Sequence, residues 1–253
     1  MSEDEPGLPS SRHWFRSYSV GRAASRLVCF PFAGGGTATF AGWQANVEDV
    51  EVVAVRLPGR EMRLRERRFR DVRLAAKSLS DAIQEQIEPP YAFFGHSMGS
   101  LLAYEVCREL DRRGARLPRR LIVSGRSAPQ IPVTSKLYQL PDAALRNVVA
   151  SYGGTPPEVV ESDYFQRYFL SMIRDDFEMA ENYVYEPALP LDVPIVALAA
   201  EDDVVAPLEN VIRWSETTAR EFYLQRFRGG HFFIQEERSL VLQFVSSILG
   251  PGA

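Results

Sequence analysis

A serine between two glycines follows an apolar run, in the sequence Gly95-His96-Ser97-Met98-Gly99. This is the pattern G-x-S-x-G, in which a serine occupies a sharp turn from a strand into a helix. The turn crowds the positions two residues before and after the serine, so both favour glycine. It would expose the Ser97 hydroxyl at the helix N-terminus, where backbone N–H groups can face a developing oxyanion. The pattern predicts a nucleophilic serine; a glycine-bordered turn without chemistry is the alternative.

A serine hydroxyl is a weak nucleophile and needs a general base. The chain has three histidines, so the base can be sought by elimination. His13 precedes the first clear strand, and the side chain of His96, the immediate neighbour of Ser97, is expected to point away from the site. His231 follows the last predicted strand in the turn R-G-G-H-F-F, where open α/β folds place their chemistry. We therefore predict His231 as the base, with a surface histidine as the alternative.

The base needs a carboxylate to orient it. The order Ser…Asp…His places this acid after the fifth predicted strand, where the chain reads E-D-D-V-V-A-P over residues 201–207. We prefer Asp203, because the orienting aspartate in such loops stands about four residues before the proline that begins the next segment. Asp202 is the alternative.

An oxyanion hole would use the N–H of Met98 and a second N–H from the loop after the first predicted strand. That loop reads F-P-F-A-G-G-G over residues 30–36, and we choose Ala33 as the donor. A phosphate-binding loop is excluded, because no G-K-[ST] follows and Thr39 stands where G-x-G-x-x-G needs glycine.

Short apolar runs alternate with helical patterns along the chain. This alternation predicts an α/β fold with a mostly parallel central sheet and helices on both faces. Near-continuous apolar character suggests strands that are covered on both sides. The expected strands are residues 26–31, 51–56, 91–94, 120–124, 194–199 and 221–227, with a further one near 14–20, and the expected helices are residues 72–87, 97–113, 208–218 and 240–248.

The segment from about residue 134 to 186 has no convincing strand. It has helical patterns over residues 142–152 and 163–185, separated by G-G-T-P-P, and it is rich in aromatic residues. An insertion of this length is too long for an ordinary loop. We predict a helical lid over a pocket, with a purely structural cap as the alternative. The expected organisation is a flexible tail over residues 1–12 and a single domain over residues 13–253.

Composition narrows the protein class. The 253 residues are 45% hydrophobic and 25% charged, and the net charge of −4 argues against a dedicated nucleic-acid binder. No apolar stretch approaches the roughly 20 residues that span a bilayer. Cys29 and Cys107 offer neither a disulfide framework nor metal-ligand spacing. We expect two buried thiols, no bound metal, a monomer and a cytoplasmic location.

Taken together, these motifs resemble the type II thioesterases that accompany modular polyketide synthases and nonribosomal peptide synthetases, within the α/β-hydrolase superfamily. The resemblance covers almost the whole chain beyond the tail. The chain departs from it at E-D-D, where the family shows a G-x-x-D-like loop, although Asp203 aligns best. The matching stretches are F-P-F-A-G-G-G (30–36), R-L-P-G-R-E (56–61), F-F-G-H-S-M-G (93–99), S-G-R-S-A-P (124–129), R-D-D-F-E-M-A-E-N-Y (174–183), E-D-D-V-V-A-P (201–207) and G-G-H-F-F (229–233).

The resemblance implies a stand-alone hydrolase that removes aberrant or stalled acyl groups from the phosphopantetheine arm of an acyl or peptidyl carrier protein. The enzyme would need no cofactor of its own, because the phosphopantetheine belongs to the partner. Ser97, His231 and Asp203 would form its triad. The alternatives are a medium-chain acyl-carrier thioesterase, a carboxylesterase or lipase, a chain-terminating thioesterase, and a catalytically silent fold that only binds the carrier.

Residues 60–73 are strongly basic. Seven arginines against three acidic residues give this stretch a charge of +4 in an acidic protein. Because carrier proteins are acidic around the pantetheine serine, we predict a docking surface that includes Arg60, Arg65 and Arg68. A solvated charged loop is the alternative.

Overall fold

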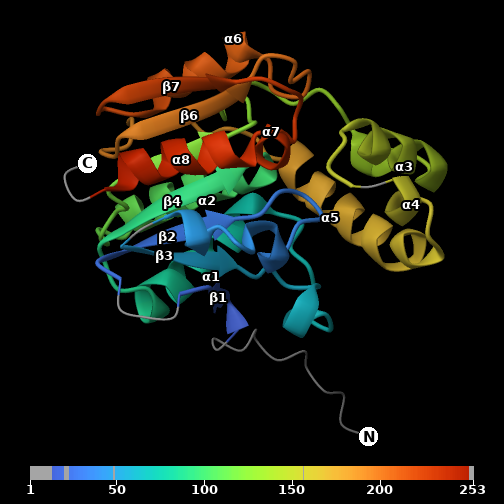
Figure 1. Cartoon of the computed structure of the whole chain (residues 1–253), viewed down its shortest axis with the longest axis horizontal. Helices are drawn as coiled ribbons and strands as arrows, with labels where there is room; N and C mark the ends of the chain where they lie inside the picture. Colours follow the sequence, from blue (N-terminus) through green and yellow to red (C-terminus); the bar gives the residue numbers. More distant parts are fainter. Residues whose placement is uncertain (1–12, 20–22, 48, 156, 251–253) are drawn as a thin grey trace, which may run out of the picture.

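A seven-stranded sheet forms the centre of the molecule (Figure 1). The computed structural model describes residues 13–19, 23–47, 49–155 and 157–250, so the predicted tail lies outside the described residues. Only β1 runs antiparallel to its neighbour, which confirms the prediction of a mostly parallel sheet. The order is β1-β3-β2-β4-β5-β6-β7, with β1 Phe15–Ser17, β2 Ser25–Phe30, β3 Val50–Val55, β4 Tyr91–His96, β5 Leu121–Ser124, β6 Ile195–Ala200 and β7 Phe222–Phe227.

The strand order reverses between β2 and β4. The chain passes from β2 to β3 on one side and then returns to place β4 on the other side of β2. Phe30 at the end of β2 pairs with Gly95 near the end of β4, so the loops that follow both strands leave the sheet at the same level. Open α/β sheets bind their ligands at such a switch point. The topology thus brings the predicted oxyanion loop beside the predicted nucleophile.

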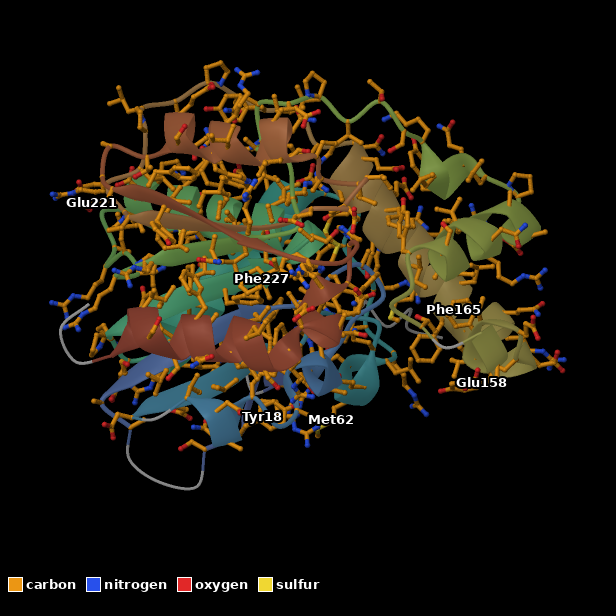
Figure 2. The ribbon with its side chains drawn as sticks, turned by 45° about the horizontal axis from the view of Figure 1, so that its top comes forward. Tyr18, Met62, Glu158, Phe165, Glu221 and Phe227 are labelled. Atoms are coloured by element: carbon orange, nitrogen blue, oxygen red, sulfur yellow. The ribbon has the colours of Figure 1, made fainter. Side chains whose placement is uncertain are left out.

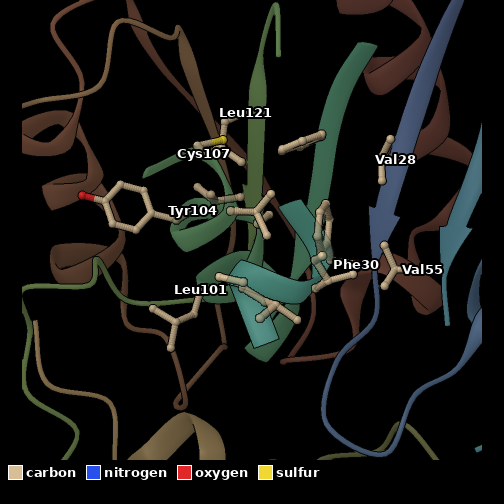
Figure 3. Close-up of a cluster of buried hydrophobic side chains, with 14 of the residues drawn as sticks. Val28, Phe30, Val55, Leu101, Tyr104, Cys107 and Leu121 are labelled. Carbon is tan, nitrogen blue, oxygen red and sulfur yellow. The ribbon is translucent and has the colours of Figure 1, made fainter. Parts of the chain in front are cut away.

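Helices cover both faces of the sheet. On one face, α1 (Val72–Gln86) and α2 (Met98–Arg112) share a core with alternate strand residues such as Val28. Figure 3 labels Leu101, Tyr104 and Cys107 of α2 in this core. On the other face, α8 (Arg238–Leu249) covers the intervening residues of the same strands, among them Cys29. Successive side chains of a strand point to opposite faces, which explains why both faces are apolar. Both cysteines are buried free thiols, as predicted, and burial raises the pKa of each.

Three sequence predictions need correction. The edge strand β7 is only partly covered, with Tyr223 54% exposed, because β6 pairs with it on one side and none of the described strands lies beyond it. The predicted helix over 208–218 is α6 (Leu208–Val211) followed by the 3-10 helix Ile212–Thr217. The predicted helix over 163–185 ends at Glu181, since Tyr183 leaves the helical path and its hydroxyl donates to Glu105 of α2. Two prolines at 187 and 190 disfavour any continuation.

A helical insertion stands between β5 and β6, to one side of the sheet (Figures 1 and 2). It contains α3 (Asp142–Ser151), α4 (Pro157–Val160), the π-helix Phe165–Phe169 and α5 (Leu170–Glu181). The first half of α5 joins a small core of the insertion, which includes Phe165, whereas Met179 and Ala180 in its second half pack into the main core. The helix α5 therefore connects the insertion rigidly to the sheet. Within the described ranges, no helix has the length and apolar character needed to cross a membrane.

Candidate active site

Ser97 stands in the sharp turn between β4 and α2. Its φ of +54° and ψ of −118° lie in a region that residues other than glycine rarely adopt. The two flanking positions must be glycine, because neighbouring backbone lies too close to each of them for a side chain. A Cβ on Gly95 would lie 2.3 Å from the carbonyl oxygen of Gly99, and a Cβ on Gly99 would lie 2.1 Å from that of Phe30. Backbone therefore meets backbone on both sides of the serine, which accounts for the G-x-S-x-G spacing.

Gly99→Ala should destabilise the protein by about 3 kcal/mol or more, because the added methyl group overlaps a backbone carbonyl that cannot rotate away. Urea unfolding of the variant and the parent measures this. Gly250→Ala is the matched control, since nothing lies within 4 Å of its added Cβ, and it should change stability by less than about 0.5 kcal/mol. Equal stability of the two variants would contradict the account of the turn.

Three predicted residues from three loops meet at the carboxyl edge of the sheet. The Ser97 Oγ lies 3.0 Å from Nε2 of His231, and Nδ1 of His231 lies 2.9 Å from Oδ2 and 3.1 Å from Oδ1 of Asp203. A carboxylate can only accept, so Nδ1 carries the proton and Nε2 is free to accept the serine hydroxyl. His231 is 6% exposed and Asp203 4% exposed, which keeps this chain of hydrogen bonds largely out of water.

The loop after β6 holds Asp203 in place. Oδ1 of Asp203 accepts the backbone N–H groups of Val205 at 2.9 Å and Ala206 at 3.1 Å. The neighbouring acids Glu201 and Asp202 are exposed, and neither makes a hydrogen bond to His231. The geometry thus favours the preferred acid over the alternative, Asp202.

Of the other two histidines, His13 lies in the segment before β1, whereas His96 lies beside His231. His13 is half-buried in the segment before β1, and its carbonyl accepts from Arg56. The expectation that His96 points away from the site is only partly right. Its side chain does not line the cavity, but its buried ring lies 5.2 Å from that of His231, with Nδ1 2.9 Å from the Ser124 hydroxyl. Burial, together with the neighbouring His231, lowers the pKa of His96 well below its usual range, so the ring is neutral.

Two backbone donors share the cavity with the serine. Met98 and Ala33 both line the cavity that contains Ser97 and His231. Among the described groups, neither backbone N–H finds a hydrogen-bond acceptor. The next two N–H groups of the Ala33 loop are already engaged, Gly34 with Asp176 at 2.7 Å and Gly35 with the Phe32 carbonyl at 2.8 Å. Ala33 is therefore well placed to be the second oxyanion donor.

The cavity has a volume of about 390 Å³. The catalytic turn and the oxyanion loop form one wall, and the helical insertion forms much of the rest. The insertion contributes mainly aromatic and aliphatic side chains, namely Val149, Tyr152, Val159, Phe165, Phe169, Ile173 and Phe177. Such a lining suits an acyl chain that reaches away from the serine.

The three predicted docking arginines do not share one environment. Arg60 is 5% exposed and forms a 2.7 Å ion pair with Asp176, so it cannot belong to a docking surface; this part of the prediction is wrong. Arg68 is half-buried, and its Nε lies 2.5 Å from Asp175. Arg65 is exposed. A basic stretch in a sequence does not show which of its arginines form ion pairs with acidic residues far away in the chain.

The chain is similar to known proteins over most of its length. The thioesterase domain family matches residues 25–249. The gramicidin S biosynthesis protein GrsT of Aneurinibacillus migulanus is 34% identical over 92% of both chains. A thioesterase of the prodiginine pathway of Streptomyces coelicolor, RedJ, is 40% identical, with a TM-score of 0.86 over 89% of this chain and 90% of that one.

A type II thioesterase from the borrelidin biosynthetic cluster, BorB, is 34% identical, with a TM-score of 0.86 over 94% of this chain and 98% of that one. These solved neighbours share the α/β-hydrolase fold seen here, which confirms the predicted fold class. The chain therefore belongs to the thioesterase domain family, is similar within it to the type II thioesterases of polyketide and nonribosomal peptide biosynthesis, and is an enzyme that hydrolyses thioesters.

Proposed function

We propose that this thioesterase removes aberrant or stalled acyl groups from the phosphopantetheine arm of acyl or peptidyl carrier proteins, and so restores the free thiol. The observation that carries the proposal is the cavity, in which Ser97, His231 and two free backbone donors meet an apolar, insertion-lined space. A relative described as a type II thioesterase of a biosynthetic cluster supports the same substrate class.

In this proposal, the Ser97 Oγ attacks the thioester carbonyl while Nε2 of His231 takes its proton, over the 3.0 Å contact seen between them. The N–H groups of Met98 and Ala33 stabilise the tetrahedral oxyanion. The carbon–sulfur bond then breaks, and His231 gives its proton to the departing thiolate, so the carrier arm leaves as a thiol. Water gives a proton to the neutral His231 as it attacks the acyl-enzyme, and His231 returns that proton to the Ser97 Oγ as the free acid leaves. Asp203 keeps His231 in the required tautomer throughout.

The direct test compares two electrophiles with the same acyl group, an acyl-carrier thioester and the matching oxygen ester. The proposal expects the thioester on the carrier to have the larger kcat/KM. A larger kcat/KM for the oxygen ester would favour a carboxylesterase. A wild-type enzyme that binds the carrier but hydrolyses neither substrate would favour a silent binding protein.

The carrier would dock on the exposed part of the basic stretch. Arg65 and Arg67 are exposed there, and so are two apolar side chains of the same stretch, Leu64 at 63% and Met62 at 69%. Figure 2 labels Met62 in this loop. This loop follows the carboxyl end of β3, at the same edge of the sheet as Ser97. A basic surface with apolar centres fits an acidic partner, because opposite charges steer the encounter and apolar contacts hold it.

Arg65→Glu with Arg67→Glu should raise KM for an acyl-carrier thioester by about 10-fold and leave a small N-acetylcysteamine thioester unaffected, because repulsion slows only the acidic partner. Steady-state kinetics at low and high salt measure this, and salt should reduce the difference. The matched control, Arg116→Glu with Arg119→Glu, reverses the charge of two exposed arginines. They precede the first residue of β5 and so lie at the amino-terminal edge of the sheet, opposite the edge that carries Ser97. Equal losses on both substrates would contradict the docking surface.

A further inference from the structure

A buried carboxylate of the insertion reaches the oxyanion loop. Asp176 lies on α5 and is 2% exposed. Its Oδ2 accepts the backbone N–H of Gly34 at 2.7 Å, and its Oδ1 accepts Nη2 of Arg60, also at 2.7 Å. Both are charge-assisted hydrogen bonds, which are stronger than bonds between neutral groups. One side chain of the insertion thus binds the residue that directly follows the predicted oxyanion donor Ala33.

Arg60 completes the contact from the other side. Its Nη1 donates to the carbonyl oxygen of Gly35 at 2.6 Å while its Nη2 binds Asp176. The planar guanidinium holds both acceptors in a fixed geometry, which a lysine could not do. Hydrogen bonds therefore hold the loop at two points: Asp176 binds the N–H of Gly34, and Arg60 binds the carbonyl of Gly35. Only the φ and ψ rotations of Ala33 separate its own N–H from the planar peptide that carries the Gly34 N–H, so fixing the Gly34 N–H reduces the freedom of the Ala33 N–H.

Close packing and a neighbouring acid limit the loop further. Gly34 has a φ of +78°, and a Cβ there would lie 2.5 Å from Ile173, one turn before Asp176 on α5. Glu61 accepts the backbone N–H of Thr37 at 2.6 Å and its hydroxyl at 2.8 Å, which holds the end of the same loop. Burial raises the pKa of Glu61, but the hydrogen bonds from Thr37 and Arg56 outweigh it and lower the pKa below its usual value. The carboxylate is thus ionised at neutral pH.

We infer that Asp176 and Arg60 are positioning residues for the oxyanion hole, and that they orient the Ala33 N–H toward the substrate carbonyl. The inference rests on the proposed function, since it takes Ala33 as an oxyanion donor. Oxyanion donors act because they are oriented before the reaction begins, and losing one lowers kcat by about 10²-fold to 10³-fold. A loosened donor should lose part of that effect.

Asp176→Asn tests the inference, because asparagine keeps the size of the side chain but has one acceptor oxygen for two donors. We expect kcat for a small thioester to fall about 10-fold to 100-fold with KM nearly unchanged, since the hydrogen bond to the oxyanion forms fully only in the transition state. Asp175→Asn is the matched control. Asp175 is the preceding residue on α5 and pairs with Arg68 and Arg70, but it makes no hydrogen bond to the oxyanion loop. It should keep kcat within about 3-fold.

A second variant covers the case in which Asp176→Asn does not fold. Arg60→Lys retains the charge next to Asp176 but loses the two-pronged contact, so it should lower kcat by a smaller factor, again with KM unchanged. Equal kcat values for Asp176→Asn, Arg60→Lys and Asp175→Asn would overturn the inference. A Ser97→Ala variant assayed in parallel distinguishes failure of this inference from failure of the proposed mechanism. Full activity of Ser97→Ala would refute the mechanism itself, whatever Asp176→Asn does.

Discussion

Ser97→Ala should lower kcat/KM for an acyl-carrier thioester by about 10⁴-fold to 10⁶-fold, the loss expected when the nucleophile of a serine triad is removed. The methyl group cannot form the acyl-enzyme, and the remaining activity would come from the oxyanion donors and the bound substrate. Steady-state or single-turnover kinetics measure the loss. Among the described residues the hydroxyl has one hydrogen bond, to His231, so the fold does not depend on it and the unfolding midpoint should change little.

Ser127→Ala is the matched control, since Ser127 lines the same cavity without a hydrogen bond to His231. It should keep kcat/KM within about 3-fold. His231→Ala should be as inactive as Ser97→Ala, and the double variant no worse than either, because the two residues act as a unit. Additive losses in the double variant would show that the two side chains act independently.

Asp203→Asn should lower kcat by about 10³-fold to 10⁴-fold. The asparagine amide can donate to Nδ1 of His231, which would move the imidazole proton to Nε2. A protonated Nε2 can no longer accept the proton of Ser97, although all three side chains stay in place. KM should change little, because Asp203 does not line the cavity.

Asp202→Asn provides the comparison on the same loop. Its exposed side chain makes no hydrogen bond to His231, so kcat should stay within about 2-fold. A large loss in Asp202→Asn together with an active Asp203→Asn would reverse the assignment of the acid. The pair therefore decides between the two candidates that the E-D-D sequence leaves open.

Short sequence patterns predict those parts of the fold that depend on residues close together in the chain. Apolar runs located the strands, and the glycine spacing located the serine turn, because both patterns arise from backbone geometry within a few residues. The small number of histidines made His231 the candidate base, and the structure places it 3.0 Å from Ser97. The partly exposed β7 was not foreseen, since an edge strand differs from a central one only in its neighbours.

Contacts between distant residues could not be predicted in the same way. Gly34 and Asp176 are 142 residues apart, and neither motif shows that one binds the other. Arg60 and the exposed Arg65 both precede a glutamate in the same basic stretch, yet Arg60 is buried. It pairs with Asp176 and donates to the Gly35 carbonyl, and the sequence shows neither contact. The burial of His96 also depends on distant residues, since Ser124 of β5 and the rings of Phe32 and Phe232 lie against it.

The claim that Ser97 is the nucleophile is tested most directly by a fluorophosphonate, which reacts with activated serines. The enzyme is treated with the probe, the modified peptide is identified by mass spectrometry, and the remaining hydrolysis of an acyl-carrier thioester is measured on the same sample. We predict one phosphonyl group per chain, located on Ser97, with activity falling in proportion to labelling. Complete modification of Ser97 with activity intact, or loss of activity through another residue while Ser97 stays free, would contradict the mechanism.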